Sequence, residues 1–111
     1  MPPNKAVRTV ADPALALDGT VLRLSGPITL NTVTPLLARG RELLPRLPDE
    51  TTLDLAGVTR IDSAGVAMLL EFWRLRSRGG ARLEFAAIPE EPRPLLQLYA
   101  LEPVFGLETR D

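Results

Sequence analysis

The sequence predicts one α/β domain built on a small mixed sheet, mostly parallel, with one antiparallel edge strand. Segments with two-residue apolar alternation and segments with helical spacing follow each other in the order β-β-α-β-α-β-α. Asp18-Gly19 joins the first two strands as a tight hairpin turn, which makes them antiparallel. The later strands are separated by helices, which favours parallel pairing through right-handed crossovers.

The length of 111 residues suits a single domain with one core. Residues 1–13 hold three prolines and little pattern, so we expect a loose N-terminal arm followed by one domain at 14–111. The first two strands are predicted within 14–26. Leu22 and Leu24 should face one side of the sheet there, because side chains alternate along a strand, and Val21 and Arg23 should face the other.

The segment 31–48 predicts a helix with recognisable ends. Asn31 or Thr32 can cap its start, and Pro45 and Pro48 end it. A strand follows at 51–57, with Leu53 and Leu55 alternating against polar residues. We expect the stretch GVTRID, at 57–62, to be a loop.

The next helix is predicted to start at Ser63 and to end at Gly79-Gly80, where glycine accepts the left-handed C-cap conformation. Residues 81–87 predict another strand, with Leu83 and Phe85 on one face. Residues 90–105 predict a last short helix that is acidic in its first turn, as the helix dipole favours.

Composition excludes several classes of function. The net charge of −1 does not suggest a nucleic-acid or anionic-membrane surface. The only local basic cluster is Arg74, Arg76, Arg78 and Arg82, which complements the C-terminus of a helix. The chain has no Cys and no His, so thiolate chemistry and the usual general base are absent. No signal peptide or membrane span is evident, and we expect a cytoplasmic protein without cofactor or metal.

The stretch RIDSAGVAMLL, residues 60–70, places a hydroxyl between a predicted strand and a predicted helix. Ser63 could be a nucleophile, a helix cap, a phosphate acceptor or a contact for another protein. A nucleophilic serine needs an adjacent base, and the only lysine, Lys5, lies in the N-terminal arm. Asp54 and Asp62 could form a catalytic carboxylate pair, but a surface charge and a cap explain them equally well. We therefore expect no enzyme activity.

As a cap, Ser63 would accept a hydrogen bond from the first turn of the helix, with Asp62 adding favourable charge. Gly65 remains unexplained by capping, since glycine in a helix costs up to about 1 kcal/mol relative to alanine. It leaves bare backbone beside the hydroxyl, which suggests close approach by another group.

The helix has two apolar strips at about 100° per residue. We expect Val66, Leu69, Leu70 and Trp73 to form the core face. Glu71, Arg74 and Arg78 form a polar stripe. The second apolar strip, on the side of Gly65, is favoured as a partner surface over internal packing, and it could also pair with itself; it comprises Met68, Phe72 and Leu75.

The stretch LDLAGVTRIDSAGVAMLL, preceded by LRLSGPIT and a helix, resembles the STAS domain family, named for sulfate transporters and anti-sigma-factor antagonists. The resemblance covers roughly residues 14–105, and Asp62-Ser63-Ala64-Gly65 is its most specific part. It implies a small mixed sheet with the helices packed mainly on one side.

Within the family, three stretches most resemble the small cytoplasmic subunit of the phospholipid-transporting Mla ABC complex of Gram-negative bacteria. They are LSGPITLNTVTPLL, DLAGVTRIDSAGVAMLLEFWRLR and PLLQLYAL. This resemblance implies a non-enzymatic subunit that binds the ATPase subunit and meets the membrane only through its partners. It places Ser63, Gly65 and the start of the helix at the partner interface. Together with the second apolar strip, the predicted partner-binding residues are Asp62, Ser63, Ala64, Gly65, Met68 and Phe72, and Asp62 either contacts the partner or only supports the helix start.

The alternative is an anti-sigma-factor antagonist, in which an anti-sigma kinase phosphorylates the hydroxyl at the position of Ser63. Phosphate there, beside Asp62, would disrupt an apolar interface by repulsion and desolvation. The sequence departs from the commonest antagonist pattern at Ala64, where a second hydroxyl is frequent, and at Val66, where leucine is usual. Neither difference excludes phosphorylation.

Overall fold

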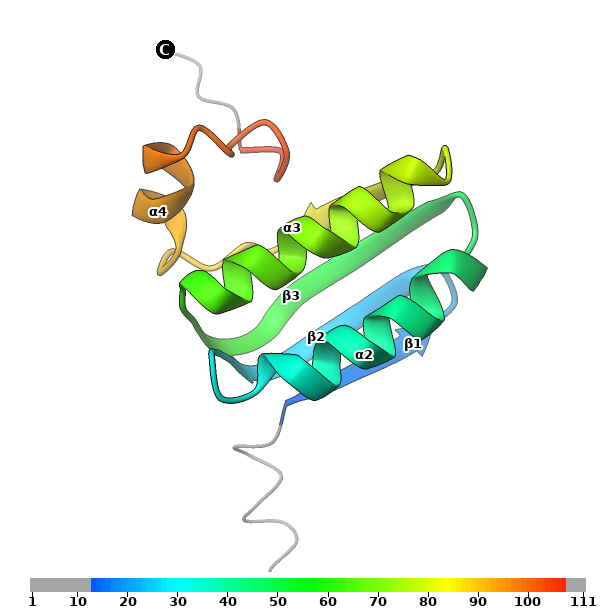
Figure 1. The fold of residues 1–111 in the computed structure, drawn as a ribbon, viewed down its shortest axis with the longest axis horizontal. Helices are drawn as coiled ribbons and strands as arrows, with labels where there is room; N and C mark the ends of the chain where they lie inside the picture. The colour runs from blue at the N-terminus through cyan, green and yellow to red at the C-terminus, as the bar shows by residue number, and fades with distance from the viewer. Residues whose placement is uncertain (1–12, 108–111) are drawn as a thin grey trace, which may run out of the picture.

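The computed structural model describes residues 13–107, so the arm predicted for 1–13 lies outside it except for its last residue. The strands form one sheet in the order β1-β2-β3-β4 (Figure 1). β1 pairs antiparallel with β2, and β2, β3 and β4 run parallel. The predicted mixed sheet is confirmed. The elements are β1 (Ala14–Asp18), β2 (Val21–Ile28), α2 (Val33–Leu43), the 3-10 turn η1 (Leu44–Arg46), β3 (Glu50–Ile61), α3 (Ser63–Arg78), β4 (Arg82–Ala86) and α4 (Arg93–Leu98).

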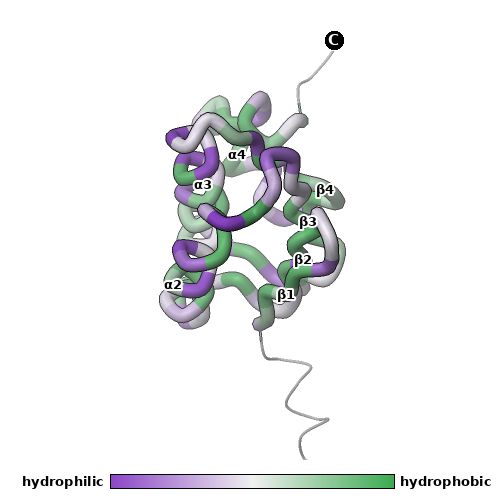
Figure 2. The backbone as a smooth tube through the Cα atoms, turned by 90° about the vertical axis from the view of Figure 1, so that its right-hand side faces the viewer, coloured by the Kyte–Doolittle hydropathy of each residue, from purple (hydrophilic) through white to green (hydrophobic). Residues whose placement is uncertain are grey.

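The fold has two layers. Figure 2 shows α2 and α3 on the left, against one face of the sheet, and the strands on the right, with the opposite face of the sheet uncovered. The alternation predicted for β2 is confirmed, because Leu22 and Leu24 are fully buried and Arg23 is exposed. On the uncovered face, Arg23 pairs with Asp18 at 3.2 Å and with Asp54 at 3.7 Å. None of the helices in the described part of the chain has the length and apolar character needed to cross a bilayer.

Two predicted elements differ in length from what the structure shows. The stretch expected to be a loop at 57–62 is largely strand, since β3 continues to Ile61. It does so because β2 stays alongside it, with Ile28 opposite Ile61, and two register shifts absorb the irregularity. The last helix is only Arg93–Leu98, and the acidic residues Glu90 and Glu91 precede it instead of occupying its first turn.

The helices α2 and α3 begin and end near the residues predicted to mark their ends, but Thr32 does not act as a side-chain cap. Thr32 occupies the N-cap position of α2, but its hydroxyl accepts from the backbone N–H of Thr29 and donates to Pro27 O, so it closes the preceding loop. Pro45 lies in η1, directly after α2. At the end of α3, Gly80 has φ of +81°, the left-handed conformation expected of a glycine at this place.

Both apolar strips of α3 contribute to the core. Val66 and Leu69 of the predicted core face are buried, whereas Leu70 and Trp73 are half-buried. Met68 and Phe72 of the second strip are 3% and 0% exposed and pack in the same core. Phe72 fits there because Gly40 of α2 leaves room for its ring, against which a Cβ at position 40 would clash. The strip expected to be a partner surface or a self-pairing surface is therefore internal packing. The reason lies in a glycine on the other helix, which the periodicity of α3 alone does not reveal.

Arg76 is 4% exposed although it carries a charge. The arginine cluster at the end of α3 was predicted to complement the helix C-terminus, but Arg76 hydrogen-bonds to carbonyls of other segments instead. Its guanidinium donates to backbone carbonyls in η1, in the turn between η1 and β3 and at the start of β4, which ties these three segments to α3. The acceptors are Leu44 O at 2.8 Å, Leu47 O at 3.3 Å, Asp49 O at 3.1 Å, Arg82 O at 3.3 Å and Pro48 O.

Replacing Arg76 by methionine should lower the free energy of unfolding by about 2–4 kcal/mol, because several buried carbonyls lose a charged donor. Arg74→Met is the matched control on the same helix. Arg74 is exposed and, within residues 13–107, pairs only with Glu71, so we expect a change within about 0.5 kcal/mol. Urea unfolding followed by Trp73 fluorescence measures both. Equal effects of the two substitutions would contradict the role assigned to Arg76.

Candidate protein-interaction site

The junction between β3 and α3 is organised by Asp62. This residue has extended backbone angles, φ −111° and ψ −169°, and it is the N-cap of α3. Its Oδ1 accepts from Gly65 N–H at 3.0 Å, and its Oδ2 accepts from Leu30 N–H at 3.0 Å. The carboxylate therefore caps the helix and holds the β2–α2 loop at the same time.

The prediction that Ser63 caps the helix is wrong by one residue. Ser63 is the first residue of α3 itself, because the chain leaves the extended conformation only after Asp62. The N-cap residue has a non-helical backbone, and its side chain accepts hydrogen bonds from backbone N–H groups of the first turn. Ser63 already has a helical backbone and so lies one residue beyond this position. Ser63 is exposed at this end of the helix. Its hydroxyl is thus presented at the surface while its neighbour performs the capping.

Gly65 is explained from within the molecule. It is buried, and a Cβ at this position would lie 2.7 Å from Ile61 Cγ1 and closer still to Ile28 O. The glycine lets the first turn of α3 approach the end of β2. The group that approaches its bare backbone is Ile28 of the same chain, so the structure accounts for this glycine without a partner.

The face of α3 that points away from the core begins at Ser63. Positions 63, 67, 70 and 74 share one side of a helix at about 100° per residue. Ser63, Ala67 and Arg74 are exposed and Leu70 is half-buried. We call these four residues the outer face of α3. Of the residues predicted to bind a partner, Asp62, Ser63 and Ala64 lie at its start, whereas Gly65, Met68 and Phe72 support it from beneath.

Leu30 is a surface residue that sequence reasoning missed. It is 73% exposed in the loop between β2 and α2, and its backbone N–H bonds to Asp62 next to Ser63. An exposed leucine at the tip of a loop leaves apolar area in water, which suits a contact surface. In the sequence, the one indication of this surface residue was an apolar side chain between the polar residues Thr29 and Asn31. It becomes informative only when the fold brings this loop beside residue 62.

The last helix lies near the same end of the molecule as the start of α3 (Figure 1). Glu91, just before α4, accepts from Ile61 N–H at 2.9 Å and pairs with Arg60 at 3.4 Å. These contacts tie the segment before α4 to the end of β3, one residue before Asp62. Leu98 and Tyr99, from the stretch PLLQLYAL, are exposed.

Asp54 and Asp62, the candidate catalytic carboxylates, lie on different parts of the molecule. Asp54 pairs with Arg23 on the uncovered face, and about seven residues of strand separate it from the junction, roughly 20 Å. Asp54 and Asp62 therefore do not form a catalytic pair. No group of three or more acidic side chains gathers within residues 13–107 in a way that could hold a metal ion.

The pKa of Asp62 lies below its ordinary value of 3.8. Burial acts to raise it, but hydrogen bonds from backbone N–H groups, those of Leu30 and Gly65 foremost, outweigh burial because they favour the charged carboxylate. A lowered pKa in the folded state means that ionised Asp62 stabilises the fold.

Asp62→Ala should lower the free energy of unfolding by about 1–2 kcal/mol, because the helix loses its cap and Leu30 N–H loses its acceptor. Ser63→Ala should change it by less than about 0.5 kcal/mol, since Ser63 is exposed and is not the cap. Thermal or urea unfolding of the two single variants distinguishes these roles. A larger loss of stability for Ser63→Ala than for Asp62→Ala would indicate that Ser63, and not Asp62, caps the helix.

The stabilisation by ionised Asp62 should depend on pH in a defined direction. It is fully present above the ordinary pKa of 3.8 and is lost as pH falls through the lower pKa of the folded state. Asp62→Asn keeps a capping side chain but removes the charge. We expect this variant to be less stable than the wild type at neutral pH and the difference to shrink in acid. A difference that stays constant down to strongly acidic pH would contradict this assignment.

The fold is similar to that of solved anti-sigma-factor antagonists. An anti-sigma factor antagonist from Mycobacterium paratuberculosis matches 84% of this chain and 80% of its own, with a TM-score of 0.67 and 19% identity. The phosphorylated Bacillus cell fate determinant SpoIIAA matches 84% of this chain and 87% of its own, with a TM-score of 0.63 and 18% identity. At these identities the likeness concerns the fold alone.

Similarity in sequence points to one branch of that fold. The intermembrane phospholipid transport system binding protein MlaB of Escherichia coli K12 is 29% identical over 83 residues, which is 75% of this chain and 82% of MlaB. MlaB of Shigella flexneri matches to the same extent. The sequence model of the family described as "Mlab, STAS domain" matches residues 12–107. The chain therefore belongs to the MlaB-type STAS domain family.

Proposed function

We propose that this protein is a non-enzymatic subunit of a phospholipid-transporting ABC complex, in which it binds the MlaF-like ATPase subunit and supports its assembly and activity. The observation that carries the proposal is the surface at the start of α3. Ser63 at the start of α3 and Leu30 in the β2–α2 loop are both exposed there. The carboxylate of Asp62 joins the two segments, because it accepts from Leu30 N–H and from Gly65 N–H. The similarity to MlaB, a binding protein of a phospholipid transport system, supplies the class of partner.

The surface has the features of a docking site. Its backbone is held in place, because Asp62 bonds to both Leu30 and Gly65 and so joins the loop to the helix. A surface that is already ordered loses less conformational entropy on binding. Small side chains at Ser63, Ala64 and Ala67 let a partner come close to the helix, and Leu30 supplies exposed apolar area.

The role of each predicted site residue follows from its position. Ser63 and Ala64 are proposed to contact the ATPase, with Leu30 and Ala67 added to them. Asp62 acts mainly by positioning the loop and the helix, since both of its oxygens accept hydrogen bonds within the chain. Gly65, Met68 and Phe72 act from the core, where they set the height of α3 above the sheet.

A second candidate function is that of an anti-sigma-factor antagonist switched by phosphorylation of Ser63. The observation that favours it is the exposure of this hydroxyl at the start of a helix, where a kinase could reach it. A phosphate there would add negative charge beside Asp62 and exposed Leu30, and so would oppose docking of an apolar partner. The two candidates share the surface and differ in the protein that occupies it.

Affinity capture from the native cell, with partners and modifications identified by mass spectrometry, separates the candidates. Wild-type bait should recover an ABC ATPase, and Ser63→Glu and Ala67→Glu should reduce that recovery at least about tenfold, because each buries a charge in the contact. Ala56→Glu is the matched control, since Ala56 is an exposed alanine on the uncovered face of the sheet. It should leave recovery unchanged.

One outcome would contradict the proposed partner, and another would contradict the proposed interface. A serine kinase in place of the ATPase, with phosphate on Ser63 of the wild-type bait, would identify an antagonist. Recovery of the ATPase that falls with Ala56→Glu and not with Ala67→Glu would keep the partner but move the interface to the uncovered face.

A further inference from the structure

β4 is an edge of the sheet with hydrogen-bonding groups directed outward. It pairs with β3 on one side and has no strand neighbour on the other among the described residues. Arg82 donates its backbone N–H to Asp49 O, on the β3 side. Since successive residues of a strand direct these groups to alternate sides, Leu83 and Phe85 direct theirs to the edge. Such an edge is a template for another strand.

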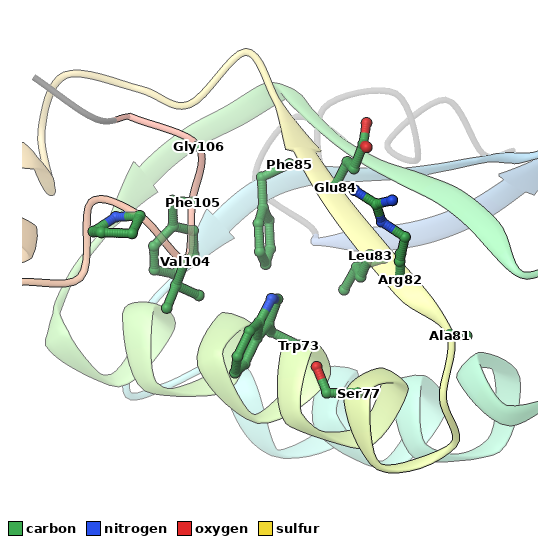
Figure 3. A pocket seen from close by; sticks show the side chains of 11 residues that line it. Trp73, Ser77, Ala81, Arg82, Leu83, Glu84, Phe85, Val104, Phe105 and Gly106 are labelled. Atoms are coloured by element: carbon green, nitrogen blue, oxygen red, sulfur yellow. The ribbon is translucent and has the colours of Figure 1, made fainter. Parts of the chain in front are cut away.

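A hollow of about 460 Å³ runs along this edge. Five consecutive residues, 81–85, line it. Alternate side chains of a strand point to opposite faces, so consecutive residues can line one cavity only when it follows the edge of the strand. In Figure 3, Trp73, Val104, Phe105 and Phe85 point into this hollow, and Arg82 and Glu84 lie on the other side of β4.

The sequence of β4 is complementary to itself when two copies run antiparallel. With Leu83 opposite Leu83 of a second copy, Arg82 faces Glu84 of that copy and Glu84 faces its Arg82. Ala81 faces Phe85, a small residue against a large one. Leu83 directs its backbone N–H and C=O outward, so the central pair can exchange two hydrogen bonds, and the flanking charged pairs fall at the closely spaced positions.

The charged side chains are available for this pairing. Arg82 and Glu84 are both exposed, and neither belongs to any ion pair within residues 13–107. Opposite charges directly across an antiparallel pair are favourable, and like charges there are unfavourable. In this one arrangement, a second copy supplies hydrogen-bond partners for the edge of β4 and opposite charges for Arg82 and Glu84. It also places Ala81 opposite Phe85.

We propose that the free edge of β4 is a self-association surface, on which a second copy of this chain pairs antiparallel about Leu83 and extends the sheet across a two-fold axis. The hollow beside Trp73 lies along the contact. This surface shares no residue with the outer face of α3, so self-association and binding of the proposed ATPase partner are independent properties. The contact is short, so the dimer should be weak and populated at roughly 100 μM protein.

Charge reversal tests the register by sedimentation equilibrium of the full chain. Arg82→Glu alone and Glu84→Arg alone each place like charges opposite each other, and we expect association at least about tenfold weaker for both. The double variant restores opposite charges in every pair and should associate within about threefold of the wild type. A wild type that stays monomeric at millimolar concentration overturns the proposal, as does a double variant no stronger than the singles.

Cysteine pairing supplies a second measurement, since the chain has no cysteine of its own. Chains carrying Arg82→Cys mixed with chains carrying Glu84→Cys should form a disulfide-linked dimer of unlike chains, because residues 82 and 84 face each other at a separation of about 4.5 Å between Cα atoms. Each variant incubated alone should cross-link much more slowly. Equal rates in the mixture and in the separate samples would indicate random collision and overturn the proposed register.

Discussion

The carboxylate of Asp62 is the contact on which the geometry of the binding end depends. Its two oxygens bond to backbone groups that are 32 and 3 residues away, those of Leu30 and Gly65. One side chain therefore sets the start of α3, the course of the β2–α2 loop and the exposure of Ser63. The close approach behind it requires a glycine at 65, because β2 ends directly beneath. The cap Asp62, the loop at Leu30 and Gly65 therefore depend on one another for their positions.

The other end of α3 is held by a different kind of interaction. Arg76 is buried and donates to carbonyls in η1, directly after η1 and at the start of β4. A helix fixed at both ends, with Phe72 packed against Gly40 between them, has little freedom to shift over the sheet. This rigidity suits a subunit whose proposed role is to present one surface to an ATPase.

The one-sided arrangement of the layers explains why two separate surfaces remain. Both central helices cover the same face of the sheet, so the outer face of α3 is turned to solvent (Figure 2). The sheet is open and not closed into a barrel, so β4 keeps a free edge. The first surface is built from small and apolar side chains on a helix. The second depends on backbone groups and on charges that complement a second copy.

The sequence by itself determined the order of elements, the mixed sheet, the faces of β2 and the family. Each of these follows from local patterns: alternation in β2, Asp18-Gly19 as a turn, and Asp62-Ser63-Ala64-Gly65 between strand and helix. The burial of the second apolar strip of α3 became evident only in the folded molecule, because Gly40 on another helix makes room for Phe72. The tertiary structure also moved the cap from Ser63 to Asp62, and it brought Leu30 to the site. These outcomes depend on contacts between segments far apart in the chain, which no local pattern records.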